Sequence, residues 1–170
     1  MVKITRSRDV ATQGGLVLLS TTTIGSAVSS VAINNVFSAT YEAYRVIISG
    51  GSNSVTGNNL YLKLGASVTG YAYTFIYTAY GSGTVSAAGN SNQTYCDYVG
   101  MADTNGLAAD FTLVNPFLAK WTIINATNPR SDLGGHTTGI HKVATSYTDL
   151  TILTSGGTMT GGTIEVYGYK

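Results

Sequence analysis

The chain has 170 residues, of which 10% are charged and 44% are hydrophobic, and its formal net charge is +1. This length suits one compact domain, and a charge so close to zero provides no overall field to attract nucleic acid or an anionic membrane surface. Apolar runs are short throughout, so neither a membrane-spanning segment nor a secretory leader is expected.

Serine, threonine and asparagine take the place of the missing charged residues. Threonine is β-branched and suits a pleated strand, so the composition favours strands over helices. A weakly charged surface resists aggregation poorly unless neighbouring subunits cover it. We therefore expect an oligomer, with other copies of this chain among its partners.

Residues 1–14 differ from the rest of the chain in being basic and poor in apolar side chains. Lys3, Arg6 and Arg8 are three of the nine basic residues. We interpret this segment as a short extended arm that attaches the protein to a partner. A solvated terminus without a binding role is the alternative.

Residues 15–170 contain short apolar and β-branched runs that are separated by clusters of Gly, Asn, Ser and Asp, such as Gly81-Ser82-Gly83 and Gly134-Gly135. This pattern is typical of strands joined by turns. The predicted strands are 16–19, 28–33, 44–49, 60–64, 72–78, 95–100, 111–115, 121–125, 139–144, 150–154 and 163–169.

Strict alternation within these runs predicts strands that bury one face. In residues 60–64 three leucines alternate with Tyr61 and Lys63, so the leucines point to one side. Strands with one buried face and short connections favour antiparallel sheets. The predicted fold class is all-β: a single antiparallel β-sandwich, jelly-roll-like, over residues 15–170. An immunoglobulin-like sandwich and a barrel are the alternatives.

Tyr71, Tyr73, Phe75 and Tyr77 share parity within one predicted strand, so their rings form a ladder on one face. Tyrosine combines a flat apolar ring with a polar tip, which suits glycan stacking or a subunit interface. We regard this ladder as a hypothetical binding or interface face. Packing into the core is the structural alternative.

The residues that carry common chemistry do not form recognisable motifs. His136 and His141 are five residues apart, which places them on opposite faces of a strand, and a single cysteine, Cys96, is predicted to be a core residue. The glycine-rich segments lack the phosphate-binding loop pattern. We predict no catalytic residue, no metal and no cofactor. A pair of aspartates that meets in a cleft, as in a glycosidase, is the enzymatic alternative.

Several segments carry a resemblance to a known class of protein. They are LSTTTIGSAVSSVAI at 19–33, FSATYEAYRVIIS at 37–49, NPFLAK at 115–120, TSYT at 145–148 and GGTIEVYGY at 161–169. In this order they resemble small virion proteins of tailed phages that infect aquatic bacteria, including cyanobacteria. The resemblance covers residues 14–169 and contains no catalytic residue.

The resemblance implies a structural protein on the exterior of a virion, commonly a homotrimer. Such proteins are capsid decorations, head fibres or tail-fibre tips. A short arm in place of a long shaft favours decoration of the head, with the major capsid protein as the partner and residues 1–14 as the attachment. The alternative is a tail-fibre tip that recognises a glycan on the host surface.

Overall fold

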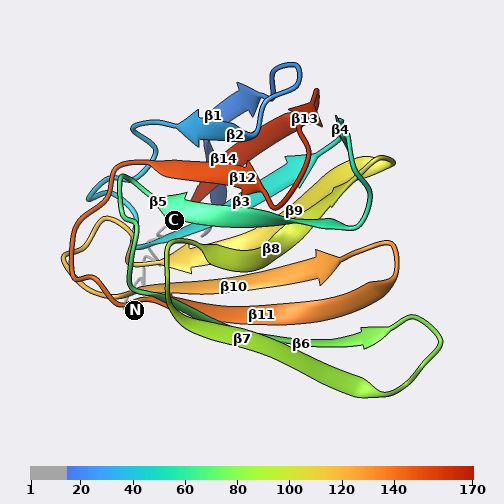
Figure 1. Ribbon diagram of the computed structural model, residues 1–170. Coiled ribbons are helices and arrows are strands. Elements are labelled where there is room, and N and C mark those ends of the chain that lie inside the picture. Colours follow the sequence, from blue (N-terminus) through green and yellow to red (C-terminus); the bar gives the residue numbers. More distant parts are fainter. Residues whose placement is uncertain (1–14) are drawn as a thin grey trace, which may run out of the picture.

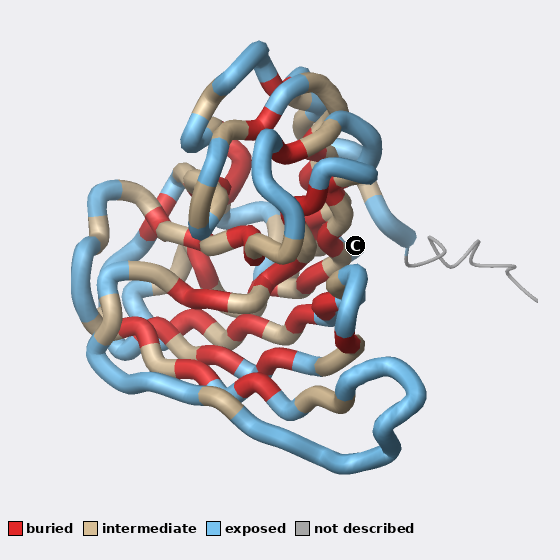
Figure 2. The backbone as a smooth tube through the Cα atoms, turned by 45° about the vertical axis from the view of Figure 1, so that its right-hand side comes forward, coloured by how far each residue is buried: buried red, intermediate tan, exposed pale blue. Residues whose placement is uncertain are grey.

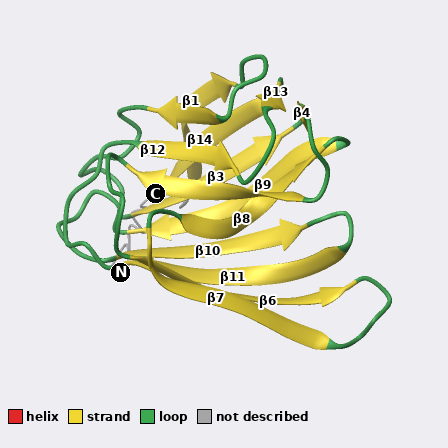
Figure 3. Cartoon of the chain, in the orientation of Figure 1, coloured by secondary structure: helices red, strands yellow, loops and turns green. Residues whose placement is uncertain are grey.

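A computed structural model describes residues 15–170 of the chain. This part consists of strands and loops, without a helix, and therefore has no helix that could cross a membrane (Figure 3). The prediction of an all-β fold with antiparallel strands is confirmed. The predicted arm, with Lys3, Arg6 and Arg8, lies outside the described residues.

The strands follow one another along the chain with short connections (Figure 1). They are β1 (Leu16–Thr23), β2 (Ser30–Ile33), β3 (Ala43–Ser49), β4 (Ser52–Asn53), β5 (Asn58–Leu64), β6 (Tyr71–Ala79), β7 (Val85–Gln93), β8 (Cys96–Asp103), β9 (Gly106–Val114), β10 (Thr122–Pro129), β11 (Leu133–His141), β12 (Leu150–Thr154), β13 (Met159–Thr160) and β14 (Thr163–Tyr169).

Twelve of the described strands form two layers, which we call the large layer and the small layer, and β4 and β13 pair separately with each other. The large layer has the order β1, β14, β3, β9, β10, β11, β6, β7. The small layer has the order β2, β12, β5, β8, and β8 packs across β10, β11 and β6 of the large layer without pairing with them. This arrangement is consistent with a β-sandwich, whereas the jelly-roll topology stays a prediction.

Strand β9 belongs to both layers. Its first residues pair with β8 of the small layer, with Ala102 opposite Leu107. From Asp110 onward it pairs with β3 on one side and β10 on the other, both in the large layer. The two layers are therefore joined by continuous backbone hydrogen bonding, and their strands together form one sheet of 12 strands.

The core lies between the layers, and its residues come from alternate positions of the strands (Figure 2). Leu60, Leu62 and Leu64 are fully buried, as their alternation predicted, and Cys96 is a core residue with no exposed surface. Burial raises the pKa of the Cys96 thiol to about 12, which makes this cysteine an apolar packing group rather than a nucleophile.

The structure differs from the sequence prediction in three strands and one turn, and two of these strands, β4 and β13, have only two residues each. Strand β7 was not predicted, because Val85–Gln93 consists mainly of small and polar residues. Gly134 and Gly135 lie inside β11 rather than in a turn. Gly135 is required there because a Cβ atom would overlap the ring of Phe75 on the neighbouring strand β6.

Three turns at one end of the molecule are held together by the buried carboxylate of Asp103. Its Oδ2 accepts hydrogen bonds from the Thr56 hydroxyl at 2.5 Å, the Gly57 amide at 3.0 Å and the Ser131 hydroxyl at 3.2 Å. Its Oδ1 accepts from the Asn105 amide at 3.2 Å. These bonds hold the pKa of Asp103 well below its usual range, because each of them favours the ionised form.

Candidate functional site

The predicted aromatic ladder on β6 lies on one face of the strand, as its parity required, but that face is the inner one. Tyr71 and Phe75 are fully buried and Tyr73 is 8% exposed, while Tyr77 at the end of the ladder is half-buried. The expectation of a ligand-binding face is therefore corrected for the first three rings. They pack into the core of a single chain.

The ladder is built into the core by ring contacts with β8 and β11. The Phe75 ring is stacked between Tyr77 and Tyr98, with centroid distances of 4.9 and 4.5 Å. Tyr71 packs against the buried His141 ring at 4.1 Å. These contacts stabilise the overlap of β8 with β6 and β11, so the ladder has a structural role.

The hydroxyl of Tyr71 accepts a hydrogen bond from the Leu64 amide at 2.7 Å in a fully buried environment. We expect Tyr71→Phe to lower the free energy of unfolding by about 1–3 kcal/mol, because the amide loses its partner away from water. Tyr77→Phe is the matched control and should change stability by less than about 0.5 kcal/mol. Urea unfolding measures both, and equal effects would contradict the core assignment.

The side chains that remain accessible on the large layer point away from the core, and we call this surface the open face. The pairing register aligns its residues in rows across the strands. One row is apolar and half-buried, and runs from β3 to β6 through Ala43, Val114, Ile123, Ile140 and Ala72. The next row is polar, and consists of Arg45, Thr112, Asn125, Thr138 and Thr74.

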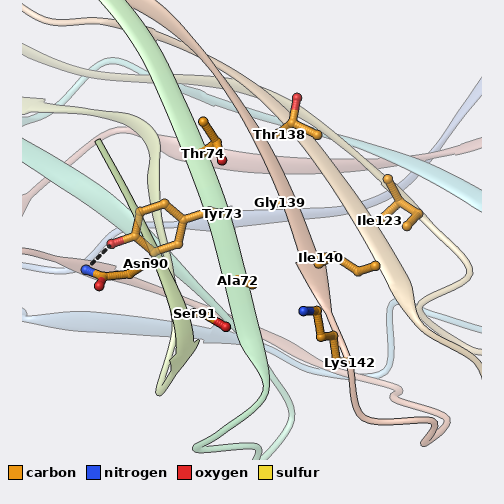
Figure 4. Close-up of a pocket in the computed structure, with 10 residues that line it drawn as sticks. All are labelled: Ala72, Tyr73, Thr74, Asn90, Ser91, Ile123, Thr138, Gly139, Ile140 and Lys142. Carbon is orange, nitrogen blue, oxygen red and sulfur yellow. Dashed lines mark hydrogen bonds between the residues drawn. The ribbon is translucent and has the colours of Figure 1, made fainter. Parts of the chain in front are cut away.

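A shallow depression of about 440 Å³ lies on the open face between β7, β6, β11 and β10 (Figure 4). Ile123 and Ile140 of the apolar row line it, and Lys142 supplies a positive charge at one end. Asn90 of β7 also borders it, and its side-chain amide donates a hydrogen bond to the Tyr73 hydroxyl at 3.5 Å on the core side of the sheet. The lining is mixed and open, which suits contact with a protein surface better than enclosure of a small molecule.

A second depression, of about 290 Å³, lies over β3, β9, β10 and β11. Its charged groups are paired: the guanidinium of Arg45 donates to both carboxylate oxygens of Asp110, at 2.8 and 2.5 Å. This contact raises the pKa of Arg45 and lowers that of Asp110. The pair spans two strands and leaves little net charge on this part of the open face.

The open face brings together a hydroxyl, an imidazole and a carboxylate, but in an order that does not suit nucleophilic catalysis. The register places Thr127 between Asp110 and His136. A catalytic triad needs the imidazole in the middle, where it can accept the proton of the hydroxyl. The Thr127 hydroxyl donates instead to the Asp110 carbonyl oxygen at 3.4 Å.

The two histidines of β11 point to opposite faces, as their spacing predicted. His136 is exposed on the open face, whereas His141 is fully buried, and its Nε2 lies 3.1 Å from the Thr69 carbonyl oxygen. Burial lowers the pKa of His141. Residues 15–170 contain no group of three or more His, Cys, Asp or Glu side chains that could hold a metal ion.

One titratable group that sequence reasoning missed is Asp97 of β8. It is 8% exposed, and burial raises its pKa to about 6, although its Oδ1 accepts the Tyr98 amide at 2.7 Å. Tyr98 has a φ of 57°, in the left-handed region, within an irregularity of the β5 and β8 pairing. Asp97 lines neither depression of the open face.

Comparison with models of protein families, with curated proteins and with solved structures finds no match to this chain. The open face is broad, weakly charged and crossed by an apolar row, and these are properties of a surface that contacts other proteins.

Proposed function

We propose that this protein is a non-enzymatic structural component of a tailed-phage virion, and that it decorates the exterior of the head. The observation that supports this proposal best is the open face, whose apolar row remains uncovered within residues 15–170. A virion surface provides neighbouring subunits that cover such a face. The sequence resemblance described above points to the same class of protein.

In this proposal, residues 1–14 bind the major capsid protein and the strands project outward, where the open face contacts a neighbouring subunit. Lys3, Arg6 and Arg8 supply positive charge that can pair with acidic groups of the capsid lattice. The protein then acts by holding neighbouring subunits together, and no reaction is required of it.

Deletion of residues 1–14 is expected to abolish binding of the purified protein to heads that lack it, because the attachment is lost. Replacing Lys3, Arg6 and Arg8 by serine should weaken binding at least tenfold and reduce its salt dependence. Co-sedimentation with heads measures the occupancy. Serine at Lys63, Lys120 and Arg130, which changes the charge equally and lies outside both depressions of the open face, is the matched control. Unchanged occupancy after the deletion would contradict the proposal.

A second candidate function is recognition of a host glycan at a tail-fibre tip. The rings of Tyr61 and Tyr95 are stacked at 4.1 Å on the small layer, and both are half-buried, so an edge of each remains accessible. A sugar ring can pack on such rings. Binding of the purified protein to a glycan array or to host cells, abolished by Tyr61→Ser, would favour this function over head decoration.

A further inference from the structure

Strand β7 is the last strand of the large layer, and within residues 15–170 one of its edges has no partner strand. Among these residues it pairs with β6 alone, through Val85–Gln93, and every second residue of an antiparallel strand directs its backbone N–H and C=O toward the unpaired side. The hairpin of β6 and β7 extends beyond the small layer at the bottom of the molecule (Figure 1). Its outer strand is exposed along almost its whole length (Figure 2).

The free edge of β7 lacks the features that normally prevent strands from pairing between molecules. Proteins protect such edges with charged side chains, proline or bulges. From Leu64 to Cys96 the sequence contains no charged residue and no proline. The only register shift between β6 and β7 lies between Tyr71 and Tyr73, at the far end, so β7 is regular from Val85 to Asn90.

The other outer strand of the large layer, β1, is also uncharged, but its pairing with β14 is interrupted in the middle. The register shifts between Leu18 and Ser20, which bends the strand. A straight ladder with another molecule is therefore easier to form along β7 than along β1.

The side chains of β7 are suited to pairing with a second copy of the same strand. Val85, Ala87 and Gly89 lie on the open-face side, opposite Thr78, Ile76 and Thr74 of β6. An antiparallel pair centred on Ala87 sets Ala87 of each copy opposite its equivalent. Val85 then lies opposite Gly89 of the partner subunit, where the missing side chain leaves room for it.

The same pairing covers apolar groups that are otherwise in water. Val85 is 67% exposed and Ile76 is 56% exposed. Ile76 is the cross-strand neighbour of Ala87, so the two copies of Ile76 lie on either side of the central Ala87 pair. No like charges meet across the pair, because β7 has none.

We propose that β7 pairs antiparallel with β7 of a second copy about a two-fold axis, so that the two large layers form one continuous sheet. The partner is a second copy of this chain, because pairing β7 with its own copy satisfies the unpaired backbone N–H and C=O groups of both strands at once. This inference does not rest on the proposed function. It predicts a two-fold contact, whereas the virion resemblance implies a trimer.

Oxidative cross-linking tests the register. In an antiparallel pair, directly opposite Cα atoms are about 4.5–5.5 Å apart, within the range of a disulfide. Ala87→Cys in the full-length protein should therefore form a covalent dimer, and the buried Cys96 should not interfere. Thr21→Cys, at an exposed position of β1, is the matched control. No cross-link at position 87, or equal cross-linking at position 21, would overturn the proposal.

Charge complementation tests the pairing without a covalent bond. Light scattering should give twice the 17.7 kDa chain mass for the unmodified protein and a single chain mass for Ala87→Lys, because two lysines would meet at the axis. Mixing Ala87→Lys with Ala87→Glu should restore the dimer. Thr21→Lys should remain dimeric. An unmodified protein that is monomeric, or a trimer that Ala87→Lys leaves intact, would overturn the proposal.

Discussion

Asp103→Asn is expected to lower the free energy of unfolding by about 2–3 kcal/mol, because hydrogen bonds to a buried ionised group are among the strongest single contributions to stability. The amide that replaces one carboxylate oxygen is a donor, and it would face donors such as the Thr56 hydroxyl and the Gly57 amide. The turns after β4, β8 and β10 would then lose their common anchor. Urea unfolding at neutral pH measures the loss.

Asp132→Asn is the matched control for this change. Asp132 is also an aspartate in a turn, but its side chain is 59% exposed and it pairs with Arg130 only two residues away. Exposed ion pairs contribute little, so the control should change stability by less than about 0.5 kcal/mol. Similar losses of unfolding free energy for the two variants would show that the Asp103 carboxylate does not hold the three turns together.

The loss of unfolding free energy caused by Asp103→Asn should become smaller as the pH is lowered. The pKa of Asp103 is depressed in the folded protein, so its contribution to stability is present above the unfolded pKa of about 4 and is lost as the pH falls further. The difference in unfolding free energy between the two proteins should therefore shrink below pH 4. Taking this difference removes the pH dependence that the two proteins share. That shared part includes the contribution of Asp97, whose raised pKa changes the unfolding free energy with pH in the opposite direction. A difference that stays constant down to pH 2 would contradict the assignment.

Gly100→Ala is expected to destabilise the fold by about 2–3 kcal/mol, in the upper part of the range for overpacked cores. A Cβ atom on Gly100 of β8 would lie 2.5 Å from the Ala109 Cβ and 2.6 Å from the Ala108 carbonyl oxygen of β9. The backbone at this point cannot move aside easily, because β9 is paired with strands of both layers.

Gly134→Ala provides the control for Gly100→Ala. Its new Cβ would meet only the Tyr80 side chain, at 3.2 Å, and Tyr80 is 61% exposed and free to turn away. This variant should change stability by less than about 1 kcal/mol. Chemical denaturation of the two variants, compared by their midpoints and slopes, decides whether the contact between β8 and β9 is as tight as the structure indicates.

The sequence was sufficient to predict most strands, because alternation of apolar and polar residues reports burial directly. It succeeded in β5, where Leu60, Leu62 and Leu64 are buried. It failed for β7, because an exposed edge strand of small residues carries no apolar alternation. The sequence also did not predict that β9 passes from the small layer into the large layer. Buried and half-buried residues alternate evenly along the whole of β9, so the pattern does not mark the point where the strand changes layer.

The candidate surfaces were harder to predict, because parity identifies which side chains share a face but not what covers that face. The ladder of Tyr71, Tyr73 and Phe75 was placed correctly on one side of a strand, and the side proved to be the core. Arg45 and Asp110 are 65 residues apart, and their pairing depends on the position of β3 beside β9. The buried Asp97 follows from a local irregularity of β8 that has no signature in the sequence.

The shared strand β9 has a mechanical consequence. Two layers that only pack against each other can slide or separate without breaking backbone hydrogen bonds. Here any such movement would have to break backbone hydrogen bonds on one side of β9. Force applied at one layer is therefore transmitted to the other through the backbone itself. The molecule should respond to load as a single stiff body and unfold in one step.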